Sequence, residues 1–144
     1  MGSPEPASGR ILALDLGEAW TGVAISDPGA VIASPVKAVP AADLADYLRT
    51  LVREEGIGEI VVGVPKTLSG EAGFQAQRVF AKLDELKKLL PETRFVEWDE
   101  RLTTRVAGVR AGGRGRRKRR SRERLDHLAA AEMLQEYLRA KGNL

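Results

Sequence analysis

Short apolar blocks separated by turn-forming residues dominate the first part of the chain. Residues 11–16 and 21–26 are apolar, β-rich runs separated by a short segment that contains Gly17, which is typical of a hairpin. A third run, 31–39, follows an Asp-Pro-Gly sequence at 27–29 that favours a turn. The pattern therefore predicts a three-stranded antiparallel meander.

The remainder of the chain alternates between helical and strand-like patterns. Leucines recur at helical spacing after residue 41, whereas the continuous apolar run EIVVGV is typical of a strand buried on both faces. After the meander, the predicted elements are a helix at 41–55, a strand at 59–64, a helix at 74–90, a strand at 95–100, a short helix at 102–110 and a helix at 121–139. The apolar positions of the second of these helices are Phe74, Val79, Phe80, Leu83, Leu86 and Leu90. This order predicts an α/β fold with a mixed five-stranded sheet, three strands antiparallel and two parallel, flanked by helices. It is compatible with the ribonuclease H-like fold.

Composition narrows the class of protein. The chain has 144 residues, 43% hydrophobic and 30% charged, which suits one compact domain. We assign that domain to residues 10–140 and treat residues 1–9, which lack the apolar block of a secretory signal, as a flexible N-terminal tail. No apolar run reaches the roughly 18 residues of a membrane span, so no membrane contact is expected. The chain has no cysteine, which excludes disulfides and thiolate metal sites and fits a cytoplasmic protein.

Charge is distributed unevenly along the chain. The segment 110–124, RAGGRGRRKRRSRER, carries nine basic residues and one acidic residue, while the other 129 residues sum to −5. A basic strip on a mildly acidic body favours a polyanionic partner, although a solvated loop is the ordinary alternative for such a run. Glycines 112, 113 and 115 indicate a mobile basic loop at 111–120.

Two strands carry a carboxylate in an apolar phase. Asp15 follows Ala13 along one side of the first strand, and both sides of that strand are otherwise apolar. On the fifth strand, Glu100 continues the apolar phase of Trp98. Its neighbour Asp99 belongs to the more polar phase, and a bulge would exchange the two, so Asp99 is the reserve candidate.

The last predicted helix carries a third carboxylate of this kind. Asp126 lies in the helical phase of Ala130, Met133 and Tyr137, which predicts that it faces the body of the protein; His127 and Glu123 fall near the same side. The residues predicted on the solvent arc of this helix are Glu132, Gln135, Glu136 and Arg139.

Each carboxylate also has an ordinary structural interpretation. Asp15 could accept hydrogen bonds from turn amides, Glu100 could pair with Arg101 or Arg105, and Asp126 could favour the helix N-terminus. Taken together, two strand ends and a helix start can meet at one edge of a sheet. Three carboxylates there would repel one another unless a cation lies among them, and oxygen ligands suit Mg²⁺ or Mn²⁺. Two such ions form a known apparatus for phosphodiester cleavage.

Four segments of the chain match a known family in order. They are LALDLGEAWTGVAISD, IVVGVPKTLSGEAGFQAQRV, WDERLTT and RKRRSRERLDHLAAAEMLQEYL, which together cover nearly everything from Arg10 to Leu138. The chain resembles the YqgF/RuvX family of RuvC-like nucleases, which includes pre-16S rRNA nucleases and Holliday junction resolvase homologues. DERLTT with a downstream basic stretch and D-x-L-A-A-like motif is specific, whereas D-x-G-x₄-G alone is weak.

The resemblance implies a ribonuclease H-like fold and a divalent-metal nuclease acting on structured RNA or branched DNA. Carried onto this sequence, the catalytic and metal-binding residues are Asp15, Glu100 and Asp126. In a two-metal site Asp15 would bridge both ions while each of the other two holds one. The implied or candidate nucleic-acid contacts are Lys66, Arg101, Thr103, Thr104, Arg114, Arg116, Arg117, Lys118, Arg119 and Arg120. Trp20 stands where the family commonly has a basic residue, so it cannot bind a phosphate by charge, but it could stack on an unpaired base.

Two other function classes remain open from sequence. One is a nucleic-acid-binding module without catalysis. The other is an actin-like or sugar-kinase-type ATP-binding lobe, which D-x-G before an apolar strand also resembles, but such enzymes use two lobes and this chain supplies one. Symmetric cleavage of a four-way junction would require a homodimer.

Overall fold

The computed structural model describes residues 9–64, 70–99 and 115–143. A five-stranded sheet with the order β3-β2-β1-β4-β5 forms the centre of the molecule. Its strands are β1 (Ile11–Leu16), β2 (Trp20–Ser26), β3 (Ala33–Pro40), β4 (Glu59–Val64) and β5 (Arg94–Asp99). The first three strands pair antiparallel, and β4 pairs parallel with both β1 and β5. The predicted mixed sheet, a meander plus two parallel strands, is confirmed.

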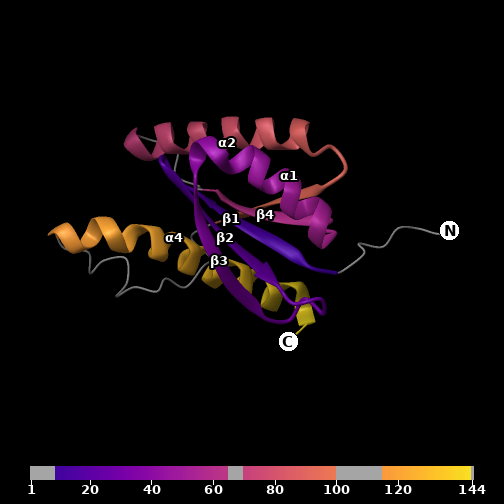
Figure 1. Cartoon of the computed structure of the whole chain (residues 1–144). Helices are drawn as coiled ribbons and strands as arrows, with labels where there is room; N and C mark the ends of the chain where they lie inside the picture. The colour runs from indigo at the N-terminus through magenta and orange to yellow at the C-terminus, as the bar shows by residue number, and fades with distance from the viewer. Residues whose placement is uncertain (1–8, 65–69, 100–114, 144) are drawn as a thin grey trace.

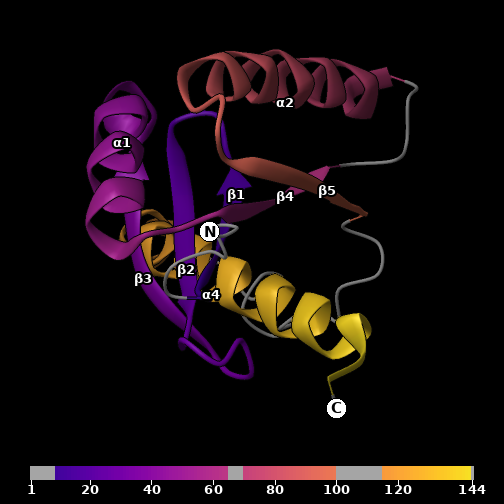
Figure 2. The same ribbon diagram turned by 90° about the vertical axis from the view of Figure 1, so that its right-hand side faces the viewer.

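Helices cover both faces of this sheet (Figure 1). They are the short 3₁₀ helix η1 (Ala41–Asp43), α1 (Leu44–Glu55), α2 (Gly70–Leu89), α4 (Gly115–Leu138) and the π-helical turn η3 (Arg139–Asn143). Figure 2 shows α1 and α2 on one side of the strands and α4 on the other. The arrangement is therefore a three-layer α/β/α sandwich.

Strict alternation along the strands builds two separate hydrophobic cores. Leu12 and Leu14 of β1 face α1 and α2, where they pack with residues such as Leu48 and Leu83. Ile11 and Ala13 face the opposite way, toward α4. Because Asp15 has the phase of Ile11 and Ala13, its position belongs to the α4 side of the sheet.

Helix α1 ends where its sequence predicts. Gly56 adopts the left-handed conformation with φ of 66°, and its backbone N–H bonds to the carbonyl of Val52. A residue without Cβ takes this conformation at little cost, so the glycine stops the helix and turns the chain into β4.

Some predicted boundaries differ from the structure. Strand β3 begins at Ala33 rather than 31, because the carboxylate of Asp27 accepts the amide N–H groups of Val31 and Ile32 at 2.7 and 2.8 Å and holds them in a loop. Helix α2 begins at Gly70 rather than at Phe74. The predicted short helix at 102–110 lies outside the described residues.

The start of α4 corrects a further boundary. The helix begins at Gly115, so residues 115–120, predicted as part of a basic loop, are helical. Arginine and lysine are good helix formers, and the sequence has no proline between Gly115 and Ser121. The rest of the predicted loop, 111–114, lies outside the described residues.

Candidate metal and nucleic-acid site

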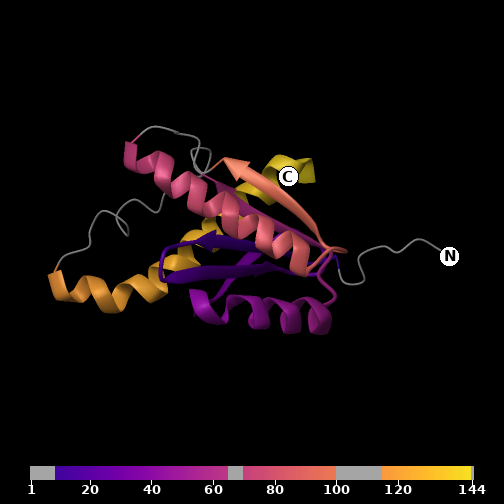
Figure 3. The same ribbon diagram turned by 90° about the horizontal axis from the view of Figure 1, so that it is seen from above.

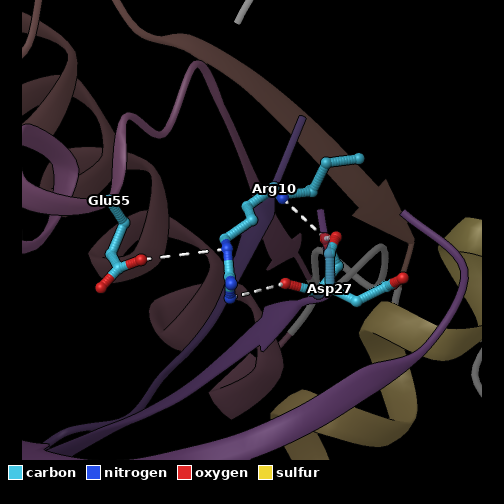
Figure 4. Close-up of polar contacts among 5 residues, drawn as sticks. Arg10, Asp27 and Glu55 are labelled. Atoms are coloured by element: carbon cyan, nitrogen blue, oxygen red, sulfur yellow. Dashed lines mark hydrogen bonds and ion pairs between the residues drawn. The ribbon is translucent and has the colours of Figure 1, made fainter. Parts of the chain in front are cut away.

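At the amino-terminal edge of the parallel strands, polar side chains form contacts that stabilise the fold. Arg10 lies 3.9 Å from the carboxylate of Glu55 and donates to the carbonyl of Ser26 at 3.5 Å (Figure 4). The buried hydroxyl of Ser26 accepts the N–H of Ile11 and donates to the carbonyl of Asp27, each at 2.9 Å. These contacts tie the start of β1 to the end of β2, and each of them has a structural explanation.

The same edge also anchors the end of α4. The hydroxyl of Tyr137 donates a short hydrogen bond to Glu59, the first residue of β4. Lys141 lies 3.9 Å from the same carboxylate and 5.4 Å from the Tyr137 ring centroid. The ring of Trp98 packs edge-on against Tyr137 with centroids 5.4 Å apart. Burial, and then the hydrogen bond to Glu59, raise the pKa of Tyr137 well above its usual range.

Asp15 lies at the opposite, carboxyl-terminal edge. It occupies the next-to-last position of β1, paired in register with Gly22 on β2, and is half-buried. The hairpin beyond it is tight: the N–H of Gly17 bonds to the carbonyl of Trp20 at 2.9 Å. A Cβ on Gly17 would lie 2.6 Å from that carbonyl oxygen, so the D-x-G motif needs its glycine for close backbone approach.

Two contacts fix the tip of this hairpin. The N–H of Ala41 bonds to the carbonyl of Ala19 at 2.8 Å, which joins the tip to the start of η1. The guanidinium of Arg78 on α2 donates to the carboxylate of Glu18 at 2.7 Å. The strand end that carries Asp15 is therefore held from two sides.

The register of β5 separates its two candidate carboxylates. Val96 and Trp98 pack into the core beneath α4, and Phe95 packs into the core beneath α1 and α2. Asp99 has the phase of Phe95; if the alternation continued beyond the end of β5, the next position would have the phase of Trp98 and hence of Asp15. Glu100 itself lies outside the described residues, so its choice over Asp99 stays a prediction.

The packing of α4 sets the place of Asp126. Ala130, Met133 and Tyr137 are buried against the sheet, as predicted. Tyr137 lies beside the start of β4, to which it is hydrogen-bonded. Asp126 is eleven residues nearer the start of the helix, so its backbone lies about 16 Å from that of Tyr137 along the helix axis. On β1, Ile11 pairs with Glu59, and Asp15 is four residues further along the strand, a distance of about 13 Å. The backbone of position 126 thus approaches the edge that carries Asp15, while its side chain lies outside the described part of the structure.

The remaining predicted contacts divide into three groups. Trp20 begins β2 and is half-buried. On α4, only the backbone is described for Arg116, Arg117, Lys118, Arg119 and Arg120. Outside the described residues lie Lys66, Arg101, Thr103, Thr104 and Arg114.

Two side chains contradict their predicted environments. Phe74, expected on the apolar face of α2, is 68% exposed, because it lies on the arc of the helix opposite the buried Ala76 and Leu83. Figure 3 shows α2 and α4 both starting on the side of the molecule where β1 ends. Gln135, expected in solvent, accepts the N–H of Ala33 at 3.0 Å and donates to the carbonyl of Val31 at 2.9 Å, because the loop before β3 folds against α4.

The described residues offer few other sites. They hold no group of three or more His, Cys, Asp or Glu side chains arranged to bind a metal. Within the same ranges, no helix combines the length and apolar character needed to cross a membrane. The Nε1 atom of Trp98 is buried and has no hydrogen-bond acceptor among the described residues.

A family model settles the relationship of this chain to known proteins. The model described as "RuvX: Holliday junction resolvase" matches residues 9–140. The chain belongs to the RuvX family. The matched range includes both the strand that carries Asp15 and the helix that carries Asp126.

Similar proteins agree with that assignment. A protein of Rubrobacter xylanophilus named "Putative pre-16S rRNA nuclease" is 58% identical over 95% of this chain and 97% of its own length. Proteins of the same name from Roseiflexus and Nocardia farcinica are 40% and 37% identical, covering 94% and 93% of this chain and 96% and 79% of their own. Among solved structures, RuvC of T. thermophilus in complex with a Holliday junction superposes with a TM-score of 0.55 at 11% identity, covering 91% of this chain and 95% of that one. This similarity confirms the RNase H-like fold.

Proposed function

We propose that this protein is a divalent-metal-dependent nuclease that hydrolyses phosphodiester bonds in structured nucleic acid. Membership of the RuvX family carries the proposal, because the family model and the similar curated proteins are all named for nuclease activity. The placement of Asp15 supports it. Its position is near the end of β1, on the phase of the strand that faces α4, the helix that also carries Asp126.

The residues proposed to hold the metal are Asp15, Glu100 and Asp126. Their carboxylate oxygens are hard ligands that fit Mg²⁺ or Mn²⁺, and the chain contains no cysteine that would select a softer metal. Bound there, a pair of ions would supply an activated water and stabilise the leaving oxygen. The contribution of the chain is to hold three carboxylates from distant segments at one edge of a rigid sheet.

The substrate is proposed from the relatives. Those named pre-16S rRNA nucleases favour a ribosomal RNA precursor, which would place the protein in the cytoplasm. The name of the family model favours a branched DNA junction, for which a homodimer would supply two sites. Basic residues on the first turns of α4, Arg116 to Arg120, lie on the side where β1 ends and would contact phosphates of either substrate.

Cleavage and metal binding together test this proposal. Native protein and Asp15→Asn are compared on four-way DNA junctions and precursor 16S rRNA, with Mg²⁺, with Mn²⁺ and with EDTA. We expect cleavage by the native protein with a metal ion only, a loss of at least about 100-fold in Asp15→Asn, and weaker metal binding by calorimetry in that variant. Asp46→Asn, on the exposed side of α1, is the matched control.

The outcomes separate this proposal from its alternatives. Tight binding of nucleic acid without cleavage under any metal condition would favour a non-catalytic binding module. Binding of ATP without binding of nucleic acid would favour an ATP-binding lobe. Cleavage that persists in folded Asp15→Asn would mean that this carboxylate is not part of the active site.

A further inference from the structure

The first turns of α2 carry an aromatic side chain that the core does not explain. Phe74 is 68% exposed, the most exposed of the large hydrophobic side chains described. It points away from the sheet, since Ala76 and Leu83 on the same helix are buried and lie on the opposite arc. A single exposed apolar residue is common on protein surfaces, so its significance depends on which groups lie beside it.

Arg78 lies one helical turn further along the same face of α2. Residues four apart on a helix have Cβ atoms about 6 Å apart, so the Phe74 ring and the Arg78 side chain are neighbours. The Arg78 guanidinium donates to Glu18 at 2.7 Å, and Glu18 lies three residues after Asp15 on the hairpin. This contact joins the exposed aromatic surface to the strand end that carries Asp15.

The ion pair itself is a weak one. The side chains of Arg78 and Glu18 are 49% and 73% exposed, and exposed ion pairs contribute little to stability. A carboxylate oxygen offers arginine the same hydrogen-bond geometry as a phosphate oxygen. A phosphate group could therefore replace Glu18 on Arg78 with little disturbance of the fold.

We propose that Phe74 and Arg78 form a subsite for an unpaired nucleotide beside the catalytic edge, with the Phe74 ring stacked on the base and Arg78 bound to the phosphate in place of Glu18. Stacking on an aromatic ring requires a base that is free of its own stack, so the subsite selects a substrate with a bulge, a flap or a junction near the cleaved bond. Helix α2 starts on the same side of the molecule as α4 (Figures 1 and 3), so a longer nucleic acid bound at this subsite could extend toward the basic turns of α4. The inference rests on the proposed nuclease function for its substrate.

Binding in EDTA tests the subsite separately from cleavage. The probes are two duplexes, one with a bulged 2-aminopurine nucleotide and one fully paired, each made in DNA and in RNA. Native protein should quench 2-aminopurine fluorescence when it binds the bulged duplex. Phe74→Ala should remove the quenching and weaken binding of the bulged duplex at least about fivefold, with less than about a twofold change for the paired duplex. Phe74→Tyr should retain both properties.

Variants of the ion pair test the phosphate contact. Glu18→Gln should strengthen binding of the bulged duplex a few-fold by releasing Arg78, and Arg78→Ala should weaken it. The matched control is Glu85→Gln, which removes the Lys82–Glu85 ion pair of 3.3 Å further along α2 and should leave binding unchanged.

The results distinguish the subsite from the nuclease. Quenching that survives in Phe74→Ala, equal weakening for bulged and paired duplexes, or the same response to Glu18→Gln as to Glu85→Gln would each overturn the subsite. A Phe74-dependent signal in a protein that never cleaves would retain the subsite and overturn the nuclease. Cleavage that depends on Asp15 but not on Phe74 would retain the nuclease and overturn the subsite.

Discussion

The hydroxyl of Tyr137 on α4 donates a hydrogen bond to the carboxylate of Glu59 at the first position of β4. The two residues are 78 positions apart in the chain, and their contact, together with the packing of Ala130 and Met133, holds α4 along the sheet. Since a helix advances about 1.5 Å per residue, a slip of one turn would move Asp126 by about 5 Å relative to Asp15. The hydrogen bond at one edge of the sheet thus contributes to the geometry proposed for the other.

Removing that hydroxyl should affect stability and activity together. Tyr137→Phe leaves the Glu59 carboxylate without its donor, and we expect a loss of about 1–3 kcal/mol in the free energy of unfolding, measured by urea denaturation. The rate of cleavage at saturating substrate should fall, because α4, which carries Asp126, is held less firmly in its position along the sheet. Tyr47→Phe, on α1 at the opposite face of the sheet, should leave cleavage unchanged.

The hydrogen bond also predicts a dependence on alkaline pH. The pKa of Tyr137 is raised in the folded state by burial and by Glu59, while the unfolded chain retains a value near 10.0. The unfolded state therefore loses its proton first, so the contribution of Tyr137 to the free energy of unfolding should be constant below about pH 10 and should fall above it. A Tyr137→Phe variant that shows the same alkaline decline would contradict this assignment.

Much of this fold was predictable because strands alternate strictly. The phase of Asp15, opposite to that of Leu14, follows from counting residues, and the two cores confirm it. The left-handed Gly56 and the buried run of β4 were likewise local signals. Each of these depends only on residues close together in the chain.

Predictions failed for two reasons. At 100° per residue Phe74 lies opposite Leu83 on α2, so helical phase already separates it from the buried residues, although its apolar character suggested otherwise. The other failures arose where a distant segment decides the environment. Gln135 lies in the polar phase of its helix, yet a loop 102 residues away supplies its hydrogen-bond partner at Ala33. The contact of Glu18 with Arg78 is of the same kind, because no sequence signal joins a hairpin tip to a helix 60 residues later.

Gly17 is predicted to be essential for the hairpin. In Gly17→Ala the new Cβ would meet the Trp20 carbonyl oxygen at 2.6 Å, and the backbone must open to relieve it. We expect a loss of roughly 1–3 kcal/mol in the free energy of unfolding and a larger relative loss of cleavage, because the hairpin follows Asp15 directly. In Gly29→Ala the nearest atom is the Asp27 carboxylate at 3.3 Å, so that control should be milder in both assays.

Asp27 is predicted to make the loop before β3 sensitive to acid. Hydrogen bonds from the amides of Ile32 and Val31 hold the pKa of its carboxyl below the usual 3.8. Stabilisation by this carboxylate is therefore present above about pH 4 and disappears as the pH falls through its folded-state pKa. NMR titration of the Asp27 carboxyl carbon should show the lowered value. Asp27→Ala should increase amide exchange at Val31 and Ile32, whereas Asp43→Ala, whose side chain makes no capping bond to α1, should not.

The helical structure of the basic first turns of α4 is predicted to be stabilised by a bound polyanion. No acidic residue lies in its first turn, so the positive end of the helix dipole coincides with a run of like charges at residues 116–120. Phosphates would relieve both effects, and added nucleic acid or salt should therefore increase the helical signal in circular dichroism.

Glutamine in place of Arg116, Arg117, Arg119 and Arg120 tests whether this helix binds the nucleic-acid backbone. The slope of log affinity against log salt should become shallower by about 0.9 for each duplex phosphate that the variant no longer neutralises, because fewer counterions are released on binding. The helical signal of the variant should also respond less to salt than that of the native protein, since the repulsion between like charges is gone. An unchanged slope in the folded variant would show that α4 does not bind phosphates, and an unchanged response of helicity to salt would contradict the electrostatic account of its first turns.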